Sequence, residues 1–105
     1  YWLERMDEKW AIRGAEEAPV LKRFPSEYVR NGQWFFHAEA EEKILPYVAS
    51  VVGDDKLFFA SDFPHWDSDY PGNVQHLLSR TDLHAALKRN VLRDNALRLY
   101  GMPGR

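Results

Sequence analysis

Residues 56–67 read Lys-Leu-Phe-Phe-Ala-Ser-Asp-Phe-Pro-His-Trp-Asp, an apolar run that ends in a carboxylate, a proline and an imidazole. The composition of residues 56–60 predicts a buried strand, so Asp62 should lie just beyond its carboxyl end. Pro64 lacks a backbone donor and disfavours the helical region for Phe63, which keeps the next residues extended or turned. Because the loops after the strands form the ligand crevice in α/β proteins, the stretch predicts a polar cluster where chemistry is done.

Composition excludes several classes of protein. The chain has 105 residues, 45% of them hydrophobic and 14% aromatic, which is ample for a core. Its formal net charge of -2, with both signs mixed along the chain, argues against a nucleic-acid or anionic-membrane partner. The absence of cysteine excludes disulfides and thiolate metal sites and fits the cytoplasm, where we expect the protein.

The sequence predicts no membrane span and no signal peptide, and it predicts a helix at the amino terminus. No apolar run approaches the roughly 18 residues of a membrane span, and no signal-peptide pattern opens the sequence. The chain begins without an initiator Met, already inside an amphipathic pattern, so we expect that an upstream portion has been cut off. Apolar residues at helical spacing predict a helix over residues 1–13 that ends at Gly14; they are Trp2, Leu3, Met6 and Trp10.

Residues 15–56 alternate between connections and regular elements. Residues 15–32 read as a long connection with one short helical turn near residues 26–29. An aromatic strand is predicted at residues 33–37, a helix at residues 45–52 with a proline in its first turn, and then the strand at residues 56–60. Strand, helix and strand form a βαβ unit with parallel strands, so His37 and Asp62 should face the same crevice.

Helices are predicted for most of the remaining chain. Asn73 is a reasonable cap for one helix, Thr81 or Asp82 for a second, and Asp94 or Asn95 for a third, while residues 102–105 read as a tail. No internal repeat and no linker divides the sequence, so we expect one domain.

Three stretches carry a resemblance to a known family. They are Pro46-Tyr47-Val48, residues 56–67, and the ending Asn-Val-Leu-Arg-Asp-Asn-Ala-Leu-Arg-Leu-Tyr-Gly at residues 90–101. Together they resemble the carboxyl-terminal third of the amidohydrolase-related metal-dependent hydrolases. This group, sometimes called amidohydrolase 2, includes the aminocarboxymuconate-semialdehyde and resorcylate decarboxylases. The most specific signal is Ala-Ser-Asp-Phe-Pro-His at residues 60–65 followed at the right distance by this ending; neither half is diagnostic alone.

The resemblance implies an α/β fold, the carboxyl-terminal part of a (β/α)8 TIM barrel. Residues 1–105 would form a single partial domain that runs from the sixth helix through the eighth strand to the closing helices, with two parallel strands. Asp62 falls on the family's eighth-strand aspartate, which binds the catalytic divalent metal and orients or deprotonates the attacking water. Zinc is the metal we expect, with manganese or another divalent ion as the alternative. The implied enzyme is a hydrolase or a non-oxidative decarboxylase acting on a small, carboxylate-bearing or aromatic substrate.

The resemblance also implies what this chain lacks. Family members supply further metal ligands, histidines and in some a glutamate, from the first and middle strands, and the chain contains none of these strands. Zinc sites need at least three protein ligands. We therefore expect a fragment that requires the remainder of the barrel and is inactive alone. The resemblance allows a homo-oligomeric parent.

Each candidate residue has a second interpretation. Asp62 can form an Asx turn with its own backbone. His37, His65 and Trp66 are candidates for the substrate pocket, but a histidine with a backbone partner and a tryptophan that covers the barrel end are the alternatives. The acidic residues before the helix at residues 45–52 are explained by the helix dipole alone. The alternative for the whole chain is a self-contained small α/β module, without catalysis, that packs or binds a partner.

Overall fold

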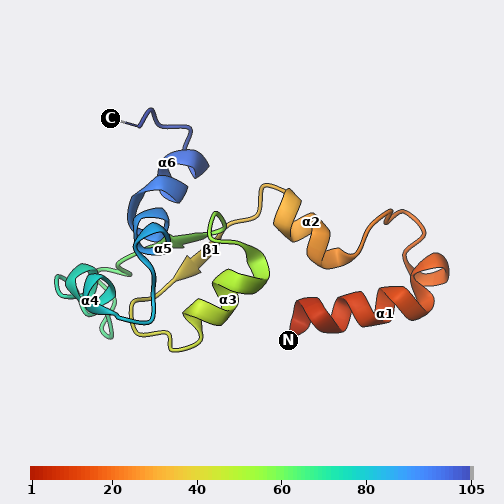
Figure 1. Cartoon of the computed structure of the whole chain (residues 1–105), viewed down its shortest axis with the longest axis horizontal. Coiled ribbons are helices and arrows are strands. Elements are labelled where there is room, and N and C mark those ends of the chain that lie inside the picture. Colours follow the sequence, from red (N-terminus) through yellow and green to blue (C-terminus); the bar gives the residue numbers. More distant parts are fainter. Residues whose placement is uncertain (105) are drawn as a thin grey trace. The chain divides into compact units, whose positions relative to one another are not determined.

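The structure, a computed structural model, describes residues 1–104 and forms two compact units, Tyr1–Trp34 and a second that begins at Phe35. Figure 1 shows a mixture of helices with a small sheet. The expected α/β character is therefore confirmed, with two parallel strands and several helices. None of the helices described in residues 1–104 combines the length and the apolar character that a transmembrane segment needs.

The first unit pairs α1 (Trp2–Glu17) with α2 (Pro25–Asn31). The predicted end of α1 at Gly14 is wrong, because the helix continues through this glycine. Gly14 is buried, and a Cβ atom there would lie 2.5 Å from Cδ1 of Trp10. The missing side chain thus makes room for the Trp10 ring rather than ending the helix.

The helical turn predicted near residues 26–29 is confirmed and longer, as α2. Pro25 occupies its first turn, where the missing N–H costs nothing. Two side chains satisfy backbone donors there: Glu27 Oε2 accepts from the Phe24 N–H at 3.0 Å, and Asp7 Oδ1 of α1 accepts from the Ser26 N–H at 2.9 Å.

The second unit contains the predicted βαβ arrangement. β1 (Phe36–Ala38) and β2 (Leu57–Phe59) pair in parallel, with Phe36 opposite Leu57 and Ala38 opposite Phe59. The connecting helix α3 (Leu45–Val52) has the predicted bounds. Both strands have only three residues, and β1 starts later than predicted. The aromatic composition of residues 33–35 does not make them strand, because only residues 36–38 lie opposite β2.

The helices after the sheet begin close to the predicted caps, except that the second starts later than Thr81 or Asp82 would place it. They are α4 (Asn73–Ser79), α5 (Ala85–Arg89), the π-helix η1 (Asn90–Asp94) and α6 (Asn95–Leu99). Asn73 is the first residue of α4 rather than its cap. The cap of α5 is His84, whose Nδ1 accepts from the Leu87 N–H at 3.2 Å.

The helices α5, η1 and α6 follow one another directly. Asp94 precedes α6 as predicted, but its backbone is helical and its side chain makes no capping hydrogen bond. Asn95, predicted as a cap, is instead fully buried, and its Nδ2 donates to the carbonyls of Asp54 and Leu57, at 2.7 Å each. These bonds join α6 to the start of β2. The core of the second unit lies where the sheet meets these helices, with β2 packed against η1 and α6; its fully buried apolar side chains include Leu45, Leu57, Leu77, Leu87 and Val91.

Candidate functional site

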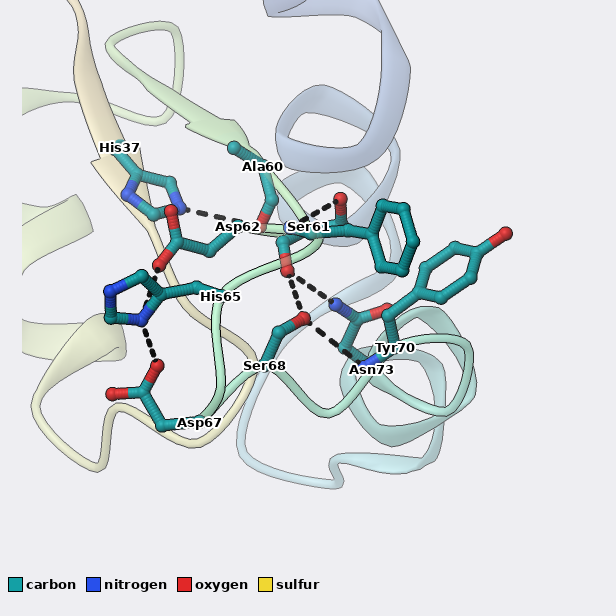
Figure 2. Close-up of polar contacts among 10 residues, drawn as sticks. His37, Ala60, Ser61, Asp62, His65, Asp67, Ser68, Tyr70 and Asn73 are labelled. Carbon is teal, nitrogen blue, oxygen red and sulfur yellow. Dashed lines mark hydrogen bonds and ion pairs between the residues drawn. The ribbon is translucent and has the colours of Figure 1, made fainter.

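The chain leaves β2 with an unusual backbone conformation at Asp62. Its φ is 54°, in the left-handed region that few residues other than glycine adopt, although aspartate is among those that tolerate it. The Asp62 carbonyl accepts from the His65 N–H at 2.8 Å, closing a turn. On the neighbouring strand, His37 Nε2 donates to the Ala60 carbonyl at 3.3 Å (Figure 2). His37 and Asp62 thus lie at the same end of the sheet, as the parallel arrangement predicts.

Asp62, His65 and Asp67 form a cluster of exposed side chains, which we call the 62–65–67 cluster. One possible ligand atom from each lies within 4.8 Å of the others. His65 Nδ1 is hydrogen-bonded to Asp67 Oδ1 and lies 3.7 Å from Asp62 Oδ2 (Figure 2). The hydrogen bond to Asp67, and next the charge of that carboxylate, raise the pKa of His65. The same hydrogen bond lowers the pKa of Asp67.

The donor types of the 62–65–67 cluster fit a divalent metal ion. Zinc takes imidazole nitrogen and carboxylate oxygen, and harder ions such as manganese prefer carboxylates. Three protein ligands are also the number that catalytic zinc sites use. However, the Nδ1 atom of the imidazole is already engaged by Asp67, so a metal would have to compete with that hydrogen bond.

A cleft of about 130 Å³ lies beside this cluster, at the carboxyl ends of both strands. Its lining includes carboxylates from the loops that follow the two strands: Glu39, Glu41, Asp62, Asp67 and Asp69. Carboxylates gathered around a concave surface favour cations there. The expectation that the dipole of α3 alone explains the acidic residues after β1 is wrong, because none of them lies in the first turn of that helix.

Only one of the predicted site residues lines the cleft. Asp62 lines the cleft, while His37, His65 and Trp66 are not among the residues that line it. Trp66 is 87% exposed. The assignment of these three to a substrate pocket stays a prediction.

Two residues that the sequence does not single out for the site hold the loop after β2 in place. Ser68 Oγ donates to the Ser61 carbonyl at 2.5 Å, and Asn73 Nδ2 donates to the same oxygen at 3.4 Å (Figure 2). The Ser61 hydroxyl accepts from the Phe63 N–H at 3.3 Å. Polar residues in a loop are too common for spacing alone to reveal these contacts.

Comparison with known proteins assigns the chain to a family. A family model described as amidohydrolase matches residues 12–102. The chain belongs to the amidohydrolase family. The resemblance seen in the sequence is thereby confirmed. Amidohydrolases of this family generally use divalent metals and act on small molecules.

A solved amidohydrolase has a similar fold. The crystal structure of an amidohydrolase from Mycobacterium avium subsp. paratuberculosis K-10 is 27% identical to the chain, with a TM-score of 0.74 over 96% of it. The chain spans only about a quarter, 24%, of that amidohydrolase's length. No curated protein matches the chain.

Proposed function

We propose that the chain is the carboxyl-terminal part of a metal-dependent amidohydrolase barrel, whose parent enzyme is a hydrolase or a non-oxidative decarboxylase. The parallel βαβ unit and the 24% coverage of the similar amidohydrolase support this proposal. β1 and β2 would be two neighbouring strands of a (β/α)8 barrel, with α1 as the helix before them. Small, carboxylate-bearing or aromatic molecules are the substrates that the family resemblance implies.

The observation that carries the proposal is the placement of Asp62. Its carboxylate stands at the tip of β2, in a cleft, on a backbone in the left-handed region. A strained backbone persists only where the surrounding structure holds it in place, and such residues are often found at functional sites. One oxygen of Asp62 would bind the metal and the other would accept the proton of the attacking water.

A divalent metal, when bound, supplies Lewis acidity that makes water a better nucleophile and polarises a carbonyl group. Zinc is the first candidate and manganese the second, since the carboxylate of Asp62 suits both. The other ligands would come from strands outside this chain. Asp62 is a single ligand, and His65 is engaged by Asp67, so the chain alone should bind metal weakly and turn over no substrate.

The alternative function is a self-contained module that packs or binds a partner without catalysis. The observation that favours it is the core of the second unit, where Leu45, Leu57 and Leu77 are fully buried within this chain. The two candidates differ in whether Asp62 serves a metal.

The test is to produce the chain together with the polypeptide encoded immediately upstream and to measure bound zinc and manganese. We expect stoichiometric metal that Asp62→Asn weakens by more than the 10–100-fold typical of losing an outer-shell partner. Asparagine is the right replacement because it also tolerates the left-handed conformation. The matched control is Asp69→Asn, a carboxylate that lines the cleft but lies outside the 62–65–67 cluster.

Two results would contradict the proposal. Equal metal content in Asp62→Asn and Asp69→Asn would show that Asp62 is not a metal ligand. Tight stoichiometric binding by the chain alone, abolished by Asp62→Asn, would show that the remainder of a barrel is unnecessary.

A further inference from the structure

The peptide group that precedes Asp62 is held by two side chains from outside the strand. Ser68 Oγ and Asn73 Nδ2 both donate to the Ser61 carbonyl oxygen, at 2.5 and 3.4 Å. Asn73 is only 5% exposed, so its amide is fixed within the fold. Figure 2 shows the two side chains converging on this oxygen.

Holding this oxygen constrains Asp62 directly. A peptide group is planar, so an anchored Ser61 carbonyl also fixes the orientation of the Asp62 N–H. On the far side of the residue, the Asp62 carbonyl is fixed by the His65 N–H at 2.8 Å. Both peptide groups that flank the left-handed residue are therefore held, and they fix the direction of the Cα–Cβ bond from which its carboxylate extends.

The hydroxyl of Ser68 makes two hydrogen bonds, one as a donor and one as an acceptor. It accepts from the Tyr70 N–H at 3.3 Å while it donates to Ser61. Asn73 likewise uses both ends of its amide, since its Oδ1 accepts from the Val74 N–H at 3.1 Å. Each side chain thus connects the backbone at the tip of β2 to the chain that leads into α4.

We propose that Ser68 and Asn73 are positioning residues that aim the Asp62 carboxylate into the cleft. The inference rests on the proposed role of Asp62 as a metal ligand. The left-handed backbone is unfavourable at a residue other than glycine. It persists only where neighbours compensate, and these two donors compensate at the oxygen beside it.

The experiment uses the 105-residue chain itself, labelled for NMR, with Mn²⁺ as the paramagnetic probe. Weak binding suffices, because Mn²⁺ broadens the amide signals of residues close to it. Ser68→Ala should raise the Mn²⁺ concentration needed to broaden residues 61–63 by about tenfold, the low end of outer-shell effects. Ser68→Thr keeps the hydroxyl and should restore the response. Asn73→Asp, which keeps Oδ1 and loses the donor, should act in the same direction as Ser68→Ala.

The matched control is Ser79→Ala. It removes a hydroxyl that donates to the His76 carbonyl at 2.8 Å, a bond of the same kind at the other end of α4. A second measurement needs no metal: the three-bond coupling between the amide and α protons of Asp62 reports its φ. It should change in Ser68→Ala and stay unchanged in Ser79→Ala. Signals elsewhere in the spectrum show whether each variant is folded.

The outcomes separate this inference from the function on which it rests. Equal broadening and an equal Asp62 coupling in the unchanged chain and in Ser68→Ala would overturn the positioning role and leave the metal role intact. If Mn²⁺ broadens residues 61–63 equally in the unchanged chain and in Asp62→Asn, the metal role is wrong. The coupling then decides the positioning role alone: a value that moves in Ser68→Ala and returns in Ser68→Thr supports it, and an unmoved value overturns it.

Discussion

At the scale of single residues, Asp62 costs stability where it stands. A left-handed backbone at a residue other than glycine is unfavourable, and an exposed side chain adds no burial in return. Glycine would remove the strain but also the carboxylate. An aspartate in this conformation, despite its cost, therefore favours a functional role for its side chain.

Arg80 shows the opposite case, a charged side chain that contributes to stability. Its guanidinium binds Asp82 through two nitrogens, at 3.0 and 2.6 Å. A third nitrogen donates to the carbonyls of Ala40 and Glu42, at 2.9 and 2.8 Å. The side chain is only 10% exposed, and it fastens the loop after β1 to the end of α4. Lysine could not reproduce this fork.

This ion pair predicts a specific loss of stability in acid. The hydrogen bond from Arg80 lowers the pKa of Asp82 below its ordinary value. A lowered folded pKa contributes stability that is complete above the unfolded pKa, about 4, and is lost as pH falls through the folded value. Asp82→Asn should therefore make the urea midpoint less sensitive to pH as the pH falls from about 5 through the folded pKa of Asp82.

The control for this prediction is Asp69→Asn. Within residues 1–104 the Asp69 carboxylate pairs only with His76 Nδ1, at the long distance of 3.9 Å, so its removal should leave the acid dependence as it is. Parallel pH curves for Asp82→Asn and the unchanged chain would contradict the prediction.

At the scale of elements, β2 is held at both ends by side chains from outside the strand. Its carboxyl end is tied by Ser68 and Asn73, and its amino end by Asn95 of α6, which donates to Asp54 and Leu57. A strand of three residues has few ladder bonds of its own. The side-chain bonds at its ends therefore replace part of the pairing that a longer strand would have.

The bonds made by Asn95 predict a large effect from a small change. Asn95→Asp keeps the shape but removes both donations and places a charge in a fully buried site. Asn95→Ala should cost about 1–3 kcal/mol of unfolding free energy, because two carbonyls lose a buried donor, and Asn95→Asp should cost more. Urea denaturation measures both.

Asn31→Ala is the matched control, because Asn31 is exposed at the end of α2. It should change the free energy of unfolding by no more than about 0.5 kcal/mol. Should Asn95→Asp prove as stable as the unchanged chain, the two 2.7 Å bonds contribute nothing to the hold on β2.

The elements differ in how far the sequence predicts them. The bounds of α3 follow from local signals, a proline in its first turn and Gly53 after its end. The parallel pairing follows from the short return between strand, helix and strand. The passage of α1 through Gly14 was not predictable, because the Trp10 ring that needs the space is recognised only in the folded helix. The cap of α5 at His84 was not predictable either, because histidine is not among the preferred capping residues.

The candidate site was also predicted only in part, because some of its contacts follow from local sequence signals and others form only in the folded chain. Asp62 follows from the strand before it and the proline after it, which are local. Ser68 and Asn73 reach Ser61 across seven and twelve positions, through a turn whose course the sequence does not specify. Contacts that depend on loop geometry leave no periodic signal.

At the scale of the whole molecule, the sheet that the structure describes has two strands and two open edges. β1 and β2 pair with each other, and among residues 1–104 no further strand covers either outer edge. The outer edge of each strand leaves backbone N–H and C=O groups without a strand partner, and such edges are a template for association with another chain. A barrel removes this liability by closing the sheet on itself. The open edges therefore favour the barrel portion over the self-contained module, which would have to leave them exposed.

This difference predicts the behaviour of the isolated chain in solution. Analytical ultracentrifugation should show association that increases with concentration, and Phe58→Lys should reduce it, because a lysine on a strand opposes pairing with another copy. Trp66→Lys is the control: Trp66 is 87% exposed but lies in the loop, so replacing it should have a smaller effect if the sheet edges drive association. Equal effects would point to general apolar attraction instead. A monomer at all concentrations that unfolds in one cooperative step would favour the self-contained module, because its sheet would then be stable with both edges open.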